Sequence, residues 1–160
     1  MKADCVVLAA MALAGVAAAA ELVANPGFET LTAKKTVAEW DSFFMREQGK
    51  GRVEVSDERH SGERGLRIVY EGEKDWALSN RRNTTVKPGE SYKITCWIKR
   101  NGTANAGTVQ VVGKKGNTLV AWSIGGTRFA RGDGWKAYDA YFTVPEGVDT
   151  VYVRLVGHGY

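Results

Sequence analysis

Strand-sized segments in which apolar and polar residues alternate are the feature that most restricts how this chain can fold. From Tyr92 to Lys99 every second residue is apolar or aromatic, and its neighbours are Lys, Thr, Trp and Lys. The same spacing recurs over residues 53–55, 66–70, 138–144 and 151–155. Successive side chains of a strand point to opposite faces, so each segment is predicted to be a strand with one face in a core.

Turn residues separate these segments. Lys87-Pro88-Gly89-Glu90 suits a turn with proline second and glycine third, and Lys115-Gly116-Asn117 suits a hairpin connection. Residues 31–39 are predicted to form a loop or a single helical turn. No long amphipathic helix, internal repeat or low-complexity linker is evident elsewhere in the sequence after residue 20. The pattern predicts an all-β fold, either a sandwich or a jelly roll.

Four phrases follow one another in a characteristic order: Asn25 to Glu29, Ser61 to Ile68, Val86 to Lys99, and Trp135 leading to Val148. Their order and spacing resemble the jelly-roll carbohydrate-binding modules found beside secreted glycoside hydrolases, the family 4/9/22-like group of the galactose-binding-like fold. The resemblance covers most of residues 21–157. It implies a β-sandwich jelly roll that binds a polysaccharide or oligosaccharide and does not transform it.

The end of the sequence departs from that family. Such modules close with a strand of the form Trp/Phe-x-Asp-Asp-Val-x-Leu, whereas this chain reads Gly157-His158-Gly159-Tyr160 where that strand would begin. We therefore expect a fold that lacks its final strand within this chain, as in a fragment of a longer protein, or one that closes differently.

Residues 1–20 have the composition of an export signal. Lys2 precedes an apolar run from Val6 to Ala20, about 15 residues, which is shorter than the roughly 20 that a membrane helix needs. Small residues before Glu21 fit signal cleavage. We expect a signal peptide over 1–20 and one domain over 21–160, without membrane insertion, that is secreted, periplasmic or on the cell surface. The alternative is that the run forms a buried core helix.

The charge of the chain narrows the classes of partner that it could bind. The chain has 22 Lys and Arg against 18 Asp and Glu, a net charge of +4, and its basic residues are scattered, with only isolated doublets. We therefore expect no nucleic-acid partner.

Without residues 1–20 only Cys96 remains, so no internal disulfide can form. About 140 residues can bury a sufficient core without one. We expect a monomer.

Aromatic side chains are the candidates for carbohydrate binding, because the apolar faces of sugars stack on them. Trp76, in a polar stretch, resembles the position of a sugar-stacking tryptophan in related modules. Trp122 resembles a second aromatic of the binding cleft, although its period-two neighbours Val120 and Ile124 favour a core position. Trp97 is predicted on the polar face of its strand. Each of these could instead be packing. Arg154 and Asn80 are the candidate hydrogen-bonding partners.

A structural calcium ion is implied by the same resemblance. In similar modules the metal is held by the glutamate of the Asn-x-Gly-Phe-Glu phrase, by oxygens around the Ser-Gly segment, and by an aspartate of the final strand. The matching positions are Glu29, Ser61 and Glu63, while the final aspartate has no counterpart. The alternative for Glu29 is a solvated or turn-capping carboxylate.

Catalytic signatures are missing from the sequence. It contains no Gly-x-Ser-x-Gly, no His-Glu-x-x-His and no Cys-x-x-Cys. We therefore expect a binding module that is not itself an enzyme, accessory to a secreted glycoside hydrolase or similar enzyme. The first alternative is a structural or interaction domain with no glycan site, which predicts a buried Trp76. The second is a polysaccharide lyase on a related jelly roll.

Overall fold

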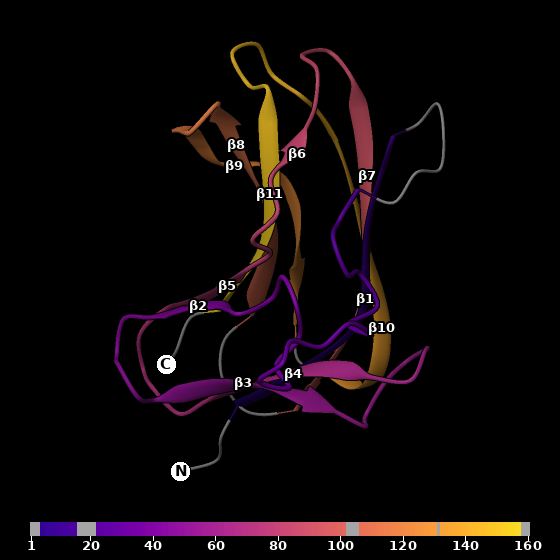
Figure 1. Cartoon of the computed structure of the whole chain (residues 1–160), viewed down its shortest axis with the longest axis vertical. Coiled ribbons are helices and arrows are strands. Elements are labelled where there is room, and N and C mark those ends of the chain that lie inside the picture. The colour runs from indigo at the N-terminus through magenta and orange to yellow at the C-terminus, as the bar shows by residue number, and fades with distance from the viewer. Residues whose placement is uncertain (1–3, 16–21, 102–105, 131, 158–160) are drawn as a thin grey trace.

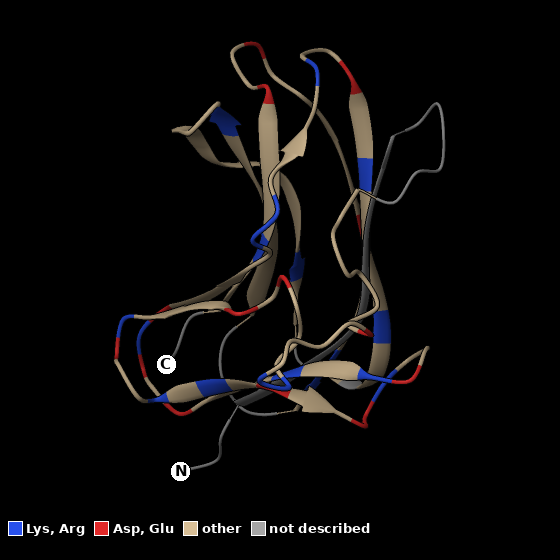
Figure 2. Cartoon of the chain, viewed as in Figure 1, with Lys and Arg blue, Asp and Glu red and all other residues tan. Residues whose placement is uncertain are grey.

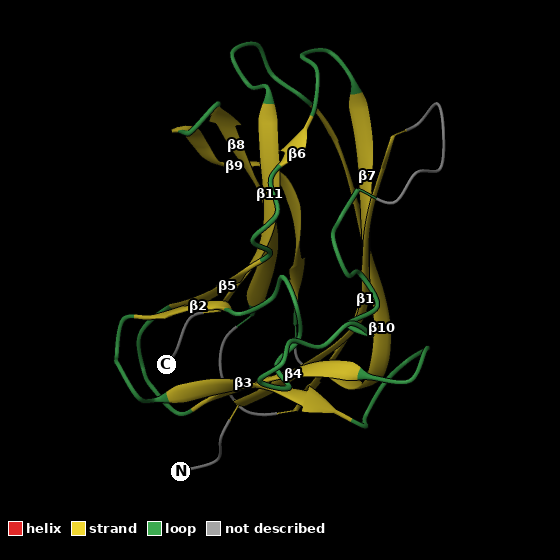
Figure 3. Cartoon of the chain, in the orientation of Figure 1, coloured by secondary structure: helices red, strands yellow, loops and turns green. Residues whose placement is uncertain are grey.

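The computed structural model describes residues 4–15, 22–101, 106–130 and 132–157. This part of the chain consists of strands, turns and loops, with no helix (Figure 3). The prediction of an all-β sandwich is confirmed, and residues 31–39 form a turn closed by a bridge between Leu31 and Val37. No helix in the described residues could cross a membrane.

Two antiparallel sheets face each other (Figure 1). One has five strands in the order β10-β7-β1-β4-β3, and the other has six, ordered β2-β5-β11-β8-β9 with β6 beside β11. The strands are β1 (Asp4–Gly15), β2 (Ser42–Met45), β3 (Gly51–Ser56), β4 (Gly65–Tyr70), β5 (Trp76–Ser79), β6 (Thr84–Thr85), β7 (Ser91–Asn101), β8 (Gly107–Lys115), β9 (Thr118–Phe129), β10 (Gly132–Thr143) and β11 (Thr150–Gly157).

The core between the sheets contains the side chains that the alternation predicted. β7 buries Tyr92, Ile94, Cys96 and Ile98, while β11 buries Val151, Val153 and Leu155. The residues between them on each strand are more exposed and face outward. Each sheet therefore has one apolar inner face and one outer face that is free to carry function.

The turns also follow the sequence. In the 87–90 turn the amide of Glu90 donates to the carbonyl of Lys87 at 3.2 Å, and Gly89 has a φ of 82°. A residue in that left-handed region is most readily glycine, which explains the Pro-Gly pair. Gly116, with a φ of 57°, lies in the tight connection between β8 and β9.

The first phrase of the sequence forms an anchored turn beside the core. Phe28 is fully buried and packs edge-on against Trp40, with 5.5 Å between the ring centroids. The indole N–H of Trp40 donates to the carbonyl of Asn25 at 3.1 Å. Asn25 also bonds the backbone of Thr30 and Ala38 through its side chain. The phrase therefore has a packing role that explains its residue types.

Strand β1 is the part of the fold that the sequence patterns did not predict. It falls within residues 1–20, the segment expected to be an export signal, and it lies between β4 and β7 (Figure 1). Asp4 to Leu8 pair with β4 from Tyr70 to Leu66. β7 pairs with β1 from Cys5 to Gly15, with a register shift between Leu8 and Met11. Within the described residues, β4 and β7 are joined in this sheet only through β1. Signal cleavage stays a prediction, and it would remove a central strand.

Candidate functional site

The outer face of the six-stranded sheet carries a polar row that crosses five strands. Directly paired residues of antiparallel strands share a face. The pairings therefore place on one line, in strand order, Ser42, Ser79, Arg154, Gln110 and Gly126. The inner neighbours of Arg154 on β11, Val153 and Leu155, are buried in the core. The row therefore faces away from the core.

Trp122 and Arg154 form the centre of this face. Trp122 on β9 is 58% exposed, and the guanidinium carbon of Arg154 lies 4.5 Å from the centroid of its ring. The Nε–H of Arg154 donates to Oε1 of Gln110 at 2.9 Å. A guanidinium against a tryptophan ring is a favourable cation–π contact, so the three side chains hold one another in place.

A second row lies beside the first and carries the adjoining apolar and basic side chains. Its members, again in strand order, are Phe44, Ala77, Val156, Thr108 and Arg128. A shallow pocket of about 260 Å³ opens between β8 and β9, and Thr108, Gln110 and Arg128 are among its lining residues. Gly126 lies opposite Gln110, where a Cβ would overlap the carbonyl oxygen of Val109. Only glycine therefore fits this close approach of β8 and β9.

Trp76 lies elsewhere, and its predicted exposure is wrong. Its side chain is only 4% exposed and packs against Phe43 and Tyr70, with ring centroids 6.0 and 6.4 Å away. The polar stretch before it forms the loop, but Trp76 itself begins β5 with its ring in the core. A ring in this position offers no face on which a sugar could stack.

Asn80 is also structural in this arrangement. It is buried, its Nδ2 donates to the carbonyl of Ala24 at 3.0 Å, and its Oδ1 accepts from the amide of Arg82 at 3.2 Å. These bonds join the end of β5 to the segment that follows residue 21. The Asn80 side chain is therefore bonded to the backbone and does not face a sugar, contrary to the prediction that it bonds sugar hydroxyls.

Trp97 lies on the outer face of the other sheet, as its place in the alternation predicted. His60, from the loop between β3 and β4, stacks on it with 3.7 Å between ring centroids and 12° between the planes. Trp135 lies beside the same histidine at 6.0 Å. Trp97 and Trp122 therefore belong to opposite faces of the molecule, and the structure does not bring them together.

Comparison with known proteins agrees with this architecture. The family model CBM_4_9, a carbohydrate binding domain, matches residues 20–158. The chain belongs to this carbohydrate binding domain family. The family explains the all-β sandwich and supports carbohydrate as the class of ligand. A search of curated proteins found no significant match.

The residues predicted to hold calcium in this carbohydrate binding domain are arranged around an arginine. Oε1 of Glu29 accepts from the amide of Glu63 at 2.8 Å, and Nη1 of Arg64 lies 3.5 Å from Oε2 of Glu29. The same nitrogen is 3.7 Å from a carboxylate oxygen of Glu63, and Ser61 is exposed.

This donor set does not fit a calcium ion. Calcium needs several oxygen ligands, whereas Glu29 is surrounded here by N–H donors and by the positive charge of Arg64. Within the described residues, no group of three or more His, Cys, Asp or Glu is placed to hold a metal. Calcium binding stays an untested implication of the resemblance, and the arrangement of Glu29 and Arg64 argues against it.

The structure adds two residues to the face that the sequence analysis did not propose for it, and it decides between the two alternatives for Trp122. Phe44 is 50% exposed, and Arg128 is exposed in the same row of the sheet. The period-two argument for burying Trp122 is wrong, because the pairing of β8 and β9 shifts register near Gly113. Such a bulge changes which face a residue occupies and leaves no clear signal in the sequence.

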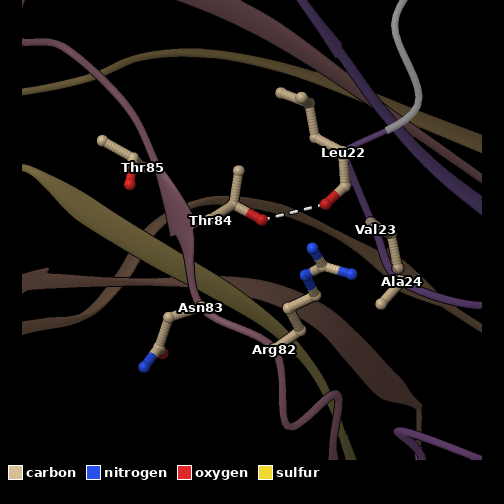
Figure 4. A pocket seen from close by; sticks show the side chains of 7 residues that line it. All are labelled: Leu22, Val23, Ala24, Arg82, Asn83, Thr84 and Thr85. Atoms are coloured by element: carbon tan, nitrogen blue, oxygen red, sulfur yellow. Dashed lines mark hydrogen bonds between the residues drawn. The ribbon is translucent and has the colours of Figure 1, made fainter.

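A larger cavity of about 370 Å³ lies between residues 22–24 and 82–85 (Figure 4). The hydroxyl of Thr84 donates to the carbonyl of Leu22 at 2.9 Å, and Arg82 points toward the same segment, while Asn83 and Thr85 point away (Figure 4). Among the residues that the structure describes, no aromatic side chain lines this cavity. It therefore lacks the platform on which a sugar ring would stack, and the sheet face is the better candidate.

Proposed function

We propose that this chain is a non-catalytic polysaccharide-binding module whose binding surface is the outer face of the six-stranded sheet. The observation that carries this proposal is the exposed ring of Trp122, held by Arg154 beside Gln110. Membership of the carbohydrate binding domain family supports the class of ligand. A large exposed aromatic among polar side chains is suited to sugars, which present both apolar faces and hydroxyls.

Binding would proceed by stacking and hydrogen bonding. Arg154 lies against one face of the Trp122 ring, which leaves the other face for a sugar. Gln110 and the terminal amino groups of Arg154 are placed to bond hydroxyls of the same or the next sugar. The polar row continues to Ser79 and Ser42, so a chain of several sugars could lie across the strands.

We further infer that the module is exported and serves a catalytic domain that acts on the same polysaccharide. The apolar segment over residues 6–20 supports export, and the resemblance to modules beside secreted glycoside hydrolases supports the accessory role. A tethered binding module raises the effective concentration of such an enzyme on its substrate.

A structural domain without a glycan site is the second candidate, and one observation favours it. That alternative predicted a buried Trp76, and Trp76 is buried. The two functions differ in what they require of Trp122. A glycan-binding module needs its exposed ring for binding, whereas a structural domain of this fold does not.

Affinity electrophoresis of the full chain in native gels with soluble polysaccharides separates the two. We expect at least one polysaccharide to retard the chain and Trp122→Ala to abolish that retardation. The matched control is Tyr141→Ala, because Tyr141 is 71% exposed and has Lys93 5.6 Å from its ring centroid, but lies on the opposite sheet. Circular dichroism establishes that each variant is folded. A folded chain that no polysaccharide retards, or equal losses in both variants, would overturn the proposed site.

A further inference from the structure

The six-stranded sheet has an unusual distribution of charge. Its strands contain no Asp or Glu, but they contain four basic residues, namely Lys114, Lys115, Arg128 and Arg154. Arg154 on β11 and Arg128 on β9 lie in the two adjacent rows of the outer face. Further along the sheet, Lys114 on β8 pairs with Thr150 on β11. The acidic residues of the described part of the chain lie in loops and in the other sheet (Figure 2).

The outer face of the five-stranded sheet is different, because its cations have carboxylate partners. Nζ of Lys93 lies 2.8 Å from Asp139, and Nζ of Lys99 lies 2.5 Å from Glu58. Arg67 lies 3.3 Å from Glu58 as well. The positive charges of Lys93, Lys99 and Arg67 on that face are therefore balanced by carboxylates of the chain itself.

Among the described residues, Arg154, Arg128 and Lys114 form no ion pair with a carboxylate. The arginine and lysine residues of the six-stranded sheet's outer face thus present uncompensated positive charge along the same strands that carry Trp122. A charged face with no opposite charge of its own attracts anionic ligands and repels cationic ones.

Arg154 is the best placed of these cations to recognise an anion. Its Nε–H is used by Gln110, and within the described residues no acceptor bonds Nη1 or Nη2. The planar pair of terminal amino groups matches a carboxylate in a bidentate arrangement. Partial burial also lowers the pKa of Arg154, since its charge is incompletely hydrated. A bound anion would replace that missing hydration.

We propose that this face selects an anionic polysaccharide, with a charged substituent at Arg154 and the sugar ring of the same or an adjacent residue on Trp122. The proposal rests on the proposed function, because it names the ligand class of the same site. A carboxylate is the group that best fits the guanidinium fork, so polyuronates are the first probe. A sulfate ester would meet the same chemistry and is the second.

Paired polysaccharides that differ only in charge provide the test. Retardation of the full chain is measured in gels containing sodium polygalacturonate or its highly methyl-esterified form, and dextran sulfate or dextran. Neutral xylan and mixed-linkage β-glucan are included to test the proposed function by itself. We expect the charged member of a pair to bind about tenfold or more tightly at low salt, a preference that weakens as salt is added.

Two variants that each remove one positive charge test whether Arg154 causes the preference for charged polysaccharides. Arg154→Gln is expected to remove most of the preference, whereas Lys34→Gln removes the same charge from an exposed loop and should preserve it. Preference for polygalacturonate identifies carboxylate as the anion, and preference for dextran sulfate alone identifies sulfate. Equal binding of charged and neutral members, or equal effects of the two variants, would overturn this inference and leave the proposed function standing. If no polysaccharide binds, the proposed function itself fails.

Discussion

Gly157 and Trp76 lie directly opposite each other where β11 pairs with β5, and the indole ring covers the glycine. A Cβ at Gly157 would overlap the six-membered ring of Trp76. The glycine therefore provides the space that the large side chain occupies. This relationship identifies Trp76 as part of the packing between the strands rather than as a platform for a ligand.

Replacing Trp76 with alanine is expected to lower the free energy of unfolding by about 3–5 kcal/mol, the usual effect of deleting a buried aromatic ring. Thermal or denaturant unfolding of the full chain measures this effect. At a temperature where Trp76→Ala is still folded, its glycan affinity should equal that of the unchanged chain. Lost binding with unchanged stability would show that a ligand reaches the ring, contrary to the structure.

The fold was predictable where local patterns carry the information. Alternation identified the buried faces of β7 and β11, and Pro88-Gly89 identified a turn that has the expected hydrogen bond and glycine φ. The role of β1 was not predictable, since an apolar run near the start of a sequence has the composition of an export signal whether or not it also pairs in a sheet. Pairing depends on distant partners that local composition does not reveal.

The candidate site was predictable only in part. Trp122 and Arg154 were both singled out, and the structure places them in contact. Trp76 was misplaced because the polar loop before it resembles an exposed lip, although the ring itself starts a strand and turns inward. Proximity between β9 and β11 arises through β8, which lies between them in the sheet, and sequence spacing does not encode that order.

The contact between Glu29 and Arg64 leads to a prediction about metal dependence. Because the guanidinium already supplies positive charge at the carboxylate, we expect EDTA or added calcium to leave the melting temperature of the full chain unchanged. Arg64→Ala should lower the melting temperature by a few degrees, since it removes bonds to both the backbone and the side chain of Glu29. A marked rise in melting temperature with calcium would instead support the metal site implied by the resemblance.

Cys96 is expected to be inert in the folded chain. Burial, and to a smaller extent the charge of Asp139, raise the pKa of its thiol to about 12. In a Cys5→Ser background, a thiol-reactive reagent at pH 8 should label Cys96 only after unfolding, because the thiolate is the reactive form. Labelling of the folded chain at the rate of an exposed cysteine would contradict the buried position.

The same thiol gives a pH dependence with a defined sign. Its pKa is raised above the unfolded value of 9.0, so its contribution to stability is complete below about pH 9 and is lost as the pH rises from there toward 12. Cys96→Val keeps an apolar side chain without the titrating proton. Above pH 9 the unfolding free energy of the unchanged chain should therefore fall relative to that of the valine variant. A difference that stays constant with pH would contradict the raised pKa of the Cys96 thiol.

Strand β1 lies within the predicted export signal and is also a central strand of the sheet, so removing the signal would remove the strand. A chain that begins at Leu22 lacks the strand between β4 and β7, which leaves the facing backbone edges of both strands without their partner. Unpaired edges favour aggregation and lower stability. We expect this shorter chain, if nothing else fills the gap, to melt at a lower temperature than the full chain and to associate in light scattering.

A proline in β1 tests the same pairing within the full chain. Val7 pairs with Arg67 on one side and Lys99 on the other, so Val7→Pro should lower the free energy of unfolding by about 1–3 kcal/mol or more, because it leaves a backbone group of a central sheet position without its hydrogen bond. Glu146→Pro is the matched control, because this position precedes Gly147 in a turn that resembles Pro88-Gly89, where proline is favourable. If Val7→Pro and the shorter chain both retain the stability of the unchanged chain, the segment acts only as a leader and the pairing in β1 makes no contribution to the fold.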